Sequence, residues 1–447
     1  MADMKPSKRW VVRGRRVLVV LLLLVIAVFA VRAVFDIWMG RRLNDEIARI
    51  EKQYGPLRYD PVRKLDAWKK WPMRIAPDNR ARVLDAAAAS ITANSERVEL
   101  NLVNSALRTP KGSVAREIAE QNRDAVQLAI RASRLRHSNW DITYVGELDN
   151  VPNLMDHRHL SKVLVAAAEA EADAGRADEA IAALTAGFAE AAAMRSEPAP
   201  VMTVNAAATA GEHVDALKDI LDRTEPSGAA LAGLQAAIEE NLDGNPARPA
   251  LLGELKHSRA QWSLVASGWL FGRRFLDHST PTPPSWWMHA VSWFFRPVIR
   301  HMAVRDLADR ARAVDAAGTP RTERAKDMLP PSVPPSVSPS WRPSVIQMAA
   351  GLIDGGDRLL AQVGLTDIAV ALRRFRLDHG AYPNTLDELV PSYFRAVPLD
   401  PYTGRQPDYT REGTGFTLRA HTPVRPLPPG AHRIPGYRDP AEWKLTR

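Results

Sequence analysis

The sequence predicts a mainly α-helical protein with an N-terminal transmembrane helix, an array of helical hairpins and a small α+β module near its C-terminal end. Three observations support this class. An unbroken apolar run follows a basic tail, alanine-rich segments with helical spacing fill the middle of the chain, and the last hundred residues carry dense turn and capping signals. At 447 residues the chain is also too long for one ordinary hydrophobic core, so two or three domains are expected.

The first element is the apolar run Val17–Val31, which extends to Phe35 past a single arginine, Arg32. A helix of this length nearly spans a hydrocarbon core about 30 Å thick. Its Val, Leu, Ile and Phe residues favour insertion by roughly 4 to 8 kcal/mol, more than the cost of about 3 kcal/mol for a mid-bilayer arginine. We therefore expect an anchor over 17–37 that contacts the lipid bilayer through Val17 to Phe35. A signal peptide cleaved after VFA, Val28 to Ala30, is the alternative.

The basic tail 1–16 predicts the orientation of this anchor. Six basic residues precede the apolar run, against Arg41 and Arg42 after it, so the positive-inside rule places the N-terminus in the cytoplasm. No later run approaches eighteen apolar residues. The expected protein is a single-pass protein of the bacterial inner membrane, with its bulk outside the cytoplasm. The net charge of +9 owes much to this tail, and the other arginines alternate with acidic residues, so no nucleic-acid partner is expected.

An exported α-helical domain is predicted over 81–329, after a connecting segment, 38–80, that begins as a charged helix and continues as a proline-punctuated stretch. Apolar spacing predicts helices over Val114–Arg136, on both sides of a turn at Ala174–Ala180, and over Val201–Asp222 and Ser227–Asn241. Gly175 suits a helix C-cap, and Asp178 can start the next helix.

Alanine dominates these segments, and its small side chain lets neighbouring helices approach closely while its helix propensity is the highest of any residue. In outline the pairs resemble the unit of tetratricopeptide-type repeats, but no fixed 34-residue period is found. Helical arrays usually present surfaces to other proteins. A simple bundle without an exposed groove is the alternative.

The segment 262–295 is rich in aromatic residues. It contains five of the twelve tryptophans, and no charged residue occurs between Ser279 and Phe295. Tryptophan is favoured at membrane interfaces, so one hypothesis is an element that rests on the membrane beside the anchor. The other hypothesis is a locally aromatic core.

A proline-rich linker, 330–343, separates the helical domain from a C-terminal module over 344–420. Six prolines in fourteen residues exclude both a helix and an inner strand there. The module is predicted to begin with a long helix, with a break near Gly355 and Gly356, that ends at Gly380. A capping box from Thr385 to Glu388 then starts a short helix, and two segments flanking REGTG form a hairpin. The remaining residues, 421–447, form a tail rich in proline and arginine.

The stretch ALRRFRLDHGAYPNTLDELVPSYFRAVPLDPYTGRQPDY resembles the C-terminal region of type II secretion major pseudopilins, in which a helix ends in an (N/H)G-x-YP motif. It is more similar still to large bacterial single-pass membrane proteins, of uncharacterised function, that join an N-terminal span and a helical region to this ending. Gly14 is followed by Arg15, and Val19 stands where a pseudopilin has glutamate. The glycine- and aspartate-rich calcium loop of the major pseudopilin is also missing. The resemblance therefore implies neither assembly into a pseudopilus nor calcium binding.

Motifs for nucleotide binding, zinc proteolysis and serine hydrolysis are missing from the sequence, and the lack of cysteine excludes disulfides and thiolate chemistry. The best metal candidate is Asp156, His157 and His159, but on a helix the two histidines would point to different sides. A polar helix start is the preferred interpretation. The motif DGGD, Asp354 to Asp357, is interpreted as a flexible turn. No catalytic residue, cofactor or metal site is predicted.

The expected function is protein interaction or scaffolding at the envelope, with other envelope proteins as partners and an association with a secretion or pilus-like system. The alternative is an envelope hydrolase with an unrecognised site. A deep pocket with converging His, Asp or Glu would favour the enzyme, whereas an open, polar-lined groove would favour binding.

Overall fold

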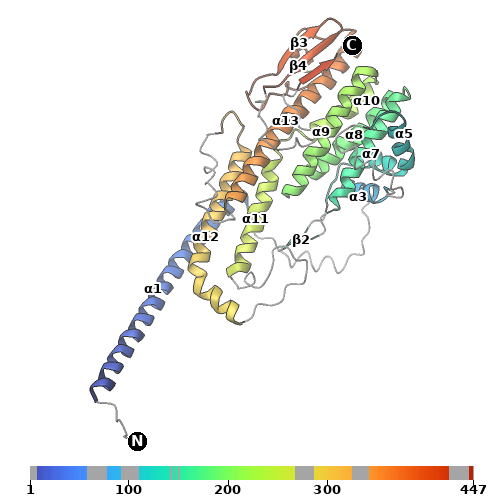
Figure 1. The fold of residues 1–447 in the computed structure, drawn as a ribbon. Helices are drawn as coiled ribbons and strands as arrows, with labels where there is room; N and C mark the ends of the chain where they lie inside the picture. Colours follow the sequence, from blue (N-terminus) through green and yellow to red (C-terminus); the bar gives the residue numbers. More distant parts are fainter. Residues whose placement is uncertain are drawn as a thin grey trace, which may run out of the picture. The chain divides into compact units, whose positions relative to one another are not determined.

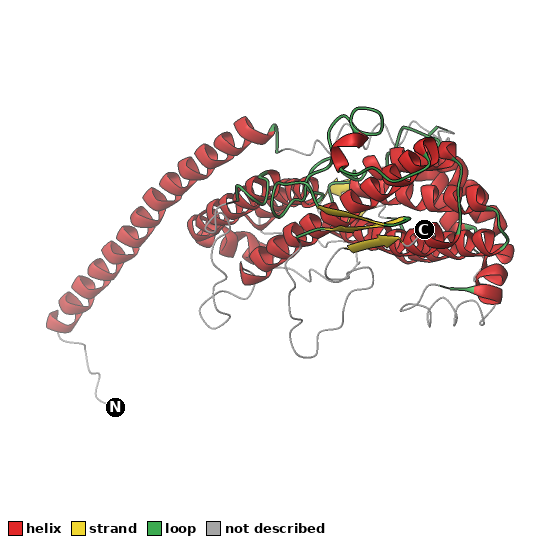
Figure 2. Ribbon diagram, turned by 90° about the horizontal axis from the view of Figure 1, so that it is seen from above, coloured by secondary structure: helices red, strands yellow, loops and turns green. Residues whose placement is uncertain are grey.

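The computed structural model describes residues 8–57, 78–91, 110–140, 143–145, 147–149, 152–266, 286–324, 342–421 and 442–445. These residues are mainly helical, as predicted, with a small antiparallel sheet near the C-terminal end (Figures 1 and 2). The chain divides into two compact units. The first consists of Met1–Tyr59 and Leu255–Asp309, and the second of Asp60–Glu254 and Arg310–Arg447. The sequence boundaries had placed 255–309 inside the predicted domain 81–329. Most of the proline-rich linker, Trp269 and much of the connecting segment and tail lie outside the described residues.

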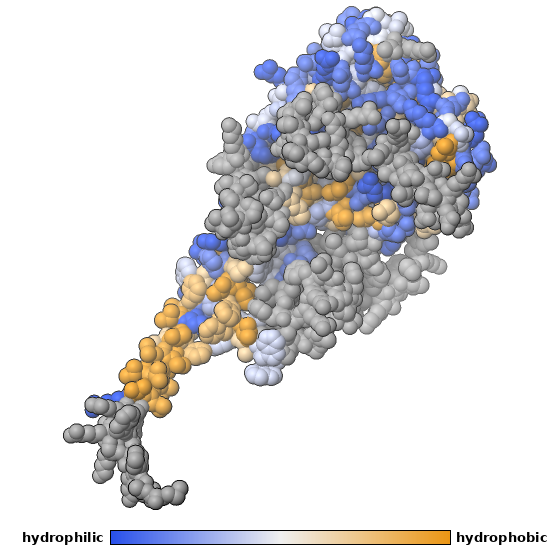
Figure 3. Space-filling model, in the orientation of Figure 1, coloured by the Kyte–Doolittle hydropathy of each residue, from blue (hydrophilic) through white to orange (hydrophobic). Residues whose placement is uncertain are grey.

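The first unit is built on helix α1, Lys8–Tyr54, which continues without a break from the predicted anchor into the charged part of the connecting segment. An 18-residue window of this helix has a mean hydropathy of 3.1, and none of the window is buried inside the protein. Apolar side chains cover this part of the surface (Figure 3). The helix is therefore long and apolar enough to cross a membrane.

Two further helices, α11, Ala247–Ala266, and α12, Trp286–Gly318, contribute to the first unit. Polar contacts join them to each other and to α1. Glu51 of α1 pairs with Arg259 of α11 at 3.3 Å, and the buried Asp306 of α12 accepts a hydrogen bond from the Trp262 indole at 2.9 Å. Since Asp306 also accepts from Ser258, its carboxylate has the partners that burial requires.

The second unit contains the predicted helical array. Its first helices are α3, Arg80–Ala89, α5, Gly112–Gln121, α6, Arg123–Ser133, α7, Leu154–Asp173, α8, Ala177–Arg195, α9, Pro200–Arg223, and α10, Gly228–Glu239. Successive helices α7, α8 and α9 pack against one another, and α10 packs on α8. A two-stranded hairpin pairs β1, Thr143–Val145, with β2, Glu147–Asp149. The predicted turn between α7 and α8 is present, with Gly175 at φ +76°.

The single helix predicted over Val114–Arg136 is wrong, because the chain forms α5 and α6 with a break at Asn122. The backbone of Asn122 leaves the helical region at φ −116°, ψ 27°. Its buried side-chain amide donates to the carbonyl of Ile118 at 2.9 Å. Asparagine readily competes with the helical backbone for such bonds, which is why it interrupts a regular apolar pattern.

Helix α13, Arg342–His379, is continuous, so the predicted break near Gly355 and Gly356 is wrong. Gly356 does not form a turn. It allows close packing, because a Cβ at this position would lie 2.2 Å from the side-chain oxygen of Asn245. The motif DGGD is likewise an ion-paired stretch of helix. Asp357 pairs with Arg324 at 2.7 Å and accepts from Asn245 at 2.7 Å, and Asp354 pairs with Arg321 at 3.0 Å.

The C-terminal module follows the predicted order. Helix α13 ends before Gly380 at φ +76°, and a short 3₁₀ helix, η3, Leu386–Leu389, follows it. The Glu388 carboxylate accepts hydrogen bonds from the amides of Thr385 and Asn384 at 2.9 and 2.8 Å. This is the glutamate half of the predicted capping box.

The predicted hairpin is formed by β3, Asp408–Glu412, and β4, Gly415–Arg419. A third strand, β5, Glu442–Leu445, comes from the tail and pairs antiparallel with β4, with Leu418 opposite Trp443. This strand was not expected from the sequence. Because β5 and α13 both contact α9, the module belongs to the same compact unit as the array.

Close helix approach is most pronounced where Gly187 of α8 meets His213 of α9. A Cβ on Gly187 would lie 1.8 Å from the Nε2 atom of the buried His213 ring. We expect Gly187→Ala to destabilise the protein by about 1 to 3 kcal/mol, because the imidazole has no open space to move into. Thermal unfolding of the full chain in detergent, followed by circular dichroism, measures the effect.

Gly233→Ala in α10 is the matched control, since nothing lies within 4 Å of a Cβ added there. Alanine should stabilise this exposed helical position by about 0.5 to 1 kcal/mol. Equal effects of the two substitutions would contradict the close packing of α8 on α9.

Candidate functional site

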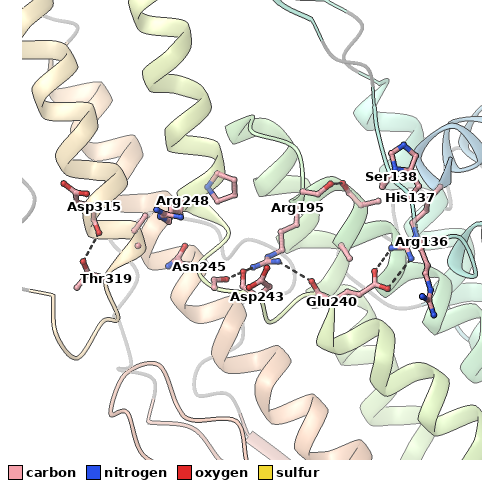
Figure 4. A pocket seen from close by; sticks show the side chains of 18 residues that line it. Arg136, His137, Ser138, Arg195, Glu240, Asp243, Asn245, Arg248, Asp315 and Thr319 are labelled. Atoms are coloured by element: carbon pink, nitrogen blue, oxygen red, sulfur yellow. Dashed lines mark hydrogen bonds and ion pairs between the residues drawn. The ribbon is translucent and has the colours of Figure 1, made fainter. Parts of the chain in front are cut away.

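A cleft of about 1050 Å³ opens in the second unit where several helices end (Figure 4). Twelve of its eighteen lining residues are polar or charged, so its character is that of an ionic groove and not of an apolar cavity. Four of them are arginines, and they come from the start of α3, the loop after α6, the end of α8 and the start of α11: Arg80, Arg136, Arg195 and Arg248. Three carboxylates, Glu240, Asp243 and Asp315, also line the cleft.

One wall of the cleft, residues 136–138, is held in place by Asn79, the N-cap of α3. The Asn79 side chain accepts from the amide of Ala81 at 3.1 Å, which caps the helix. The same side chain donates to the carbonyl of Asn139 at 2.8 Å and accepts from its amide at 3.0 Å. Trp140 extends this attachment by donating to the carbonyl of Ala193 at 2.9 Å. The loop is therefore fastened to both α3 and α8.

Two of the arginines, Arg80 and Arg195, hold parts of the fold together. The buried Arg80 donates to the carbonyl of Leu135 at 2.8 Å and pairs with Glu240. Arg195 reaches from the end of α8 to the turn after α10, where it donates to the carbonyls of Asp243 and Gly244 (Figure 4). It also donates to the carbonyl of Glu240, the C-cap of α10, at 3.3 Å, and such carbonyls lack helical partners. Burial lowers the pKa of Arg195, although a guanidinium stays charged near neutral pH.

The other two arginines differ in their surroundings. Arg136 and Arg248 are exposed, and neither forms an ion pair with another described residue. In Figure 4 they lie on opposite sides of Arg195. Ser138, on the Arg136 side of the cleft (Figure 4), has a buried hydroxyl without a hydrogen-bond partner in the described part of the chain. Two unpaired guanidinium groups at a cleft can bind carboxylates in a bidentate manner, so the geometry suits an anionic ligand.

The residues that the sequence singled out as a metal candidate lie elsewhere. Helix α7 includes Asp156, His157 and His159, which agrees with the preferred interpretation of a polar helix start. His157 is buried between two other helices, with its Nδ1 2.8 Å from Glu190 of α8 and its Nε2 3.1 Å from Asp85 of α3. In the described residues no three His, Asp or Glu side chains converge as metal ligands.

The imidazole of His157 holds these helices together as a buried cation. Burial alone would lower its pKa, but hydrogen bonds to Asp85 and Glu190 outweigh burial and raise the pKa to about 9. At neutral pH both ring nitrogens therefore donate. The site stabilises the array, and neither carboxylate is free to act on a ligand.

No protein-family model, curated protein or solved structure matches this chain.

Sequence reasoning did not find the arginine cleft, because its residues come from segments more than a hundred residues apart. The local signals were present but ordinary. They are the basic residues in RLRHSNW, which follows one helix, and in NPARP, which starts another. Only the fold brings Arg136 and Arg248 to the same opening.

His157→Gln should remove the buried cation and leave the fully buried Glu190 without its charged partner. We expect a loss of about 3 to 5 kcal/mol in the free energy of unfolding near pH 6, as for other broken buried ion pairs. The native pKa near 9 lies above the ordinary 6.5, so the stabilisation from His157 is complete below pH 6.5 and declines as pH rises through 9. Urea unfolding of both proteins from pH 6 to pH 10 should show the difference shrinking.

His159→Gln, two residues further along α7, is the control, since His159 is only half-buried. Its effect should stay within about 0.5 kcal/mol at every pH. A His157→Gln defect that is independent of pH would show that the imidazole is not a buried cation.

Proposed function

We propose that this protein is a single-pass envelope protein whose helical unit binds acidic segments of other proteins in the arginine cleft. The observation that carries the proposal is the exposure of Arg136 and Arg248 without ion pairs among the described residues. Exposed and unpaired guanidinium groups are available for carboxylates. The anchor in α1 supports a role at the membrane.

The size and lining of the cleft favour a peptide segment. At about 1050 Å³ it is at the upper end of small-molecule sites, which are mostly apolar, whereas this lining is mostly polar. A segment with Asp or Glu side chains would satisfy both arginines at once. Its charge would also speed encounter with the cleft, and the affinity would fall as salt rises.

Binding is favoured over hydrolysis because the lining lacks the relay that a nucleophile needs. His137 and Ser138 are adjacent in sequence, but among the described residues no carboxylate contacts the imidazole of His137 and no base contacts the hydroxyl of Ser138. Activated serines require a base within hydrogen-bond distance and a third group that orients it. The cleft thus supports the interaction role.

The cellular setting in the proposal comes from the anchor and from the C-terminal module. The N-terminal basic tail supports a cytoplasmic N-terminus and a bacterial inner membrane, with the cleft outside the cytoplasm. The resemblance of the module to pseudopilin endings supports partners from a secretion or pilus-like system. We propose this setting without assembly into a pilus.

Replacing Arg136 and Arg248 tests the cleft directly. Arg136→Glu/Arg248→Glu should weaken the binding of a fluorescein-labelled hexaglutamate peptide to the detergent-solubilised full chain by about tenfold or more, because a hydrogen bond to a charged group contributes about 1.5 to 3 kcal/mol. Fluorescence anisotropy at low salt measures the affinity. A hexalysine peptide should not bind.

The charge-matched control is Arg116→Glu/Arg123→Glu, which changes two exposed arginines outside the cleft. This variant should bind hexaglutamate as the parent protein does. If the two double variants lose affinity equally, the binding reflects overall charge and the cleft is not the site.

A further inference from the structure

The start of α12 presents a set of exposed aromatic side chains that the fold leaves without protein partners over much of their surface. Trp286 is 83% exposed and Trp287 is 48% exposed. Trp293, Phe294 and Phe295 are also exposed, so the described residues of this aromatic segment do not form a locally aromatic core. Exposed apolar patches of this kind mark surfaces that meet a partner or a membrane.

This aromatic face is joined to the apolar span of α1 within the first unit. The ring of Trp293 lies 6.1 Å from the ring of Phe29, and the guanidinium carbon of Arg32 lies 3.8 Å from the centre of the Trp293 ring. Phe29 and Arg32 fall in the last part of the apolar run, about 9 Å or less from its end at Phe35 at 1.5 Å per residue. The aromatic residues therefore begin at the level where α1 leaves the hydrocarbon core.

Pro297 accounts for the geometry of this junction. A proline inside a helix cannot donate to the carbonyl four residues earlier, here that of Trp293, and its ring bends the helix. The carbonyl of Trp293 instead accepts from the Arg32 guanidinium, and that of Phe294 accepts from the same group at 3.4 Å. Figure 1 shows the first turns of α12 bent away from the axis of α1.

Arg300 fixes the two helices beyond the bend. Its guanidinium donates to the Asp36 carboxylate at 2.8 Å and to the Asp36 carbonyl at 2.7 Å. It also lies against Gly40, where a Cβ would be only 2.7 Å from the guanidinium nitrogen. The aromatic turns of α12 are thus held at the end of the anchor by contacts that leave their outer faces open.

The charges near the aromatic face suit a lipid surface. From Trp286 to Arg305 there is no acidic residue, and Arg296 and Arg305 follow the aromatic stretch, in addition to Arg300, which is paired with Asp36. Aromatic rings beside basic side chains are the composition that favours the headgroup region, especially of anionic lipids. A protein partner would not explain why the face continues directly from the apolar surface of α1.

We propose that residues Trp286–Phe295 of α12 lie in the headgroup region of the same bilayer that α1 spans, with their aromatic side chains inserted as a second membrane contact. The proposal rests on the proposed anchor and adds a membrane contact made by a helix more than 250 residues later in the sequence. The first unit is then held in a fixed orientation to the membrane, instead of rotating about a single helix.

The test uses the full chain in nanodiscs of phosphatidylcholine and phosphatidylglycerol, with an environment-sensitive fluorophore on one introduced cysteine. The chain has no native cysteine, so each label reports a single site. The label in Ala290→Cys, an exposed position between the aromatic residues, should emit at shorter wavelength and lose intensity with lipids that carry a nitroxide near the headgroup. The label in Ala229→Cys, an exposed position of α10, should show neither change.

Ala27→Cys separates failure of this inference from failure of the anchor. Its label should be quenched by lipids with a nitroxide deep in the acyl chain. If the Ala27→Cys label is quenched and the Ala290→Cys label is not, the anchor stands and the aromatic contact is refuted. A blue-shifted Ala290→Cys label that no nitroxide lipid quenches would mean a protein contact, which also refutes the proposal.

A second pair of variants tests whether the rings themselves make the contact. In the Ala290→Cys background, Trp286→Ser/Trp287→Ser/Phe294→Ser/Phe295→Ser should abolish headgroup quenching. The control removes four exposed apolar side chains of the second unit: Met155→Ser/Val204→Ser/Leu377→Ser/Leu399→Ser. Quenching should persist in this control, and its persistence in the aromatic variant as well would overturn the proposal.

Discussion

The close approach of alanine-rich helices is the constraint on which the second unit depends. Small side chains bring α8 and α9 so near that Gly187 lies against the His213 ring. Helix α13 similarly approaches the turn before α11, where Gly356 lies against Asn245. Such an interior has little room for long polar side chains. Those that are buried must have partners, and His157 between Asp85 and Glu190 is the clearest case.

The same constraint explains where the cleft occurs. The arginines of the cleft lie at or near helix ends, where carbonyls without helical partners can accept their hydrogen bonds. Arg195 is the last residue of α8, and Arg80 is the first residue of α3. Both are used to fasten neighbouring helix ends. Arg136 and Arg248 occupy similar positions without such partners among the described residues, which leaves their charges available to a ligand.

Local signals predicted several elements of the fold, because these depend on nearby residues, although the break at Asn122 was missed. The helix stop at Gly380, the bonds of Glu388 and the turn at Gly175 each arise within a few residues, and each was predicted. Features set by distant residues were missed. The third strand pairs Trp443 with Leu418, and Asp357 finds its ion-pair partner more than thirty residues earlier. The candidate cleft belongs to this second class, so composition and spacing alone could not assemble it.

In the first unit, the anchor and the aromatic turns of α12 are linked by one arginine. Arg32 interrupts the apolar run, which from sequence is only a cost to insertion. In the structure it satisfies the carbonyl that Pro297 leaves open and lies on the Trp293 ring. Arg32, which from sequence only disfavours membrane insertion, therefore connects α1 to α12.

The central claim is that α1 crosses the membrane once and carries the helical unit to the outside. Single-cysteine topology tests it most directly, because the native chain has no cysteine. In intact spheroplasts, a membrane-impermeant maleimide should label Ala229→Cys at once and should label Ser7→Cys only after the membrane is permeabilised. Labelling of Ser7→Cys before permeabilisation, or protection of Ala229→Cys, would contradict the account.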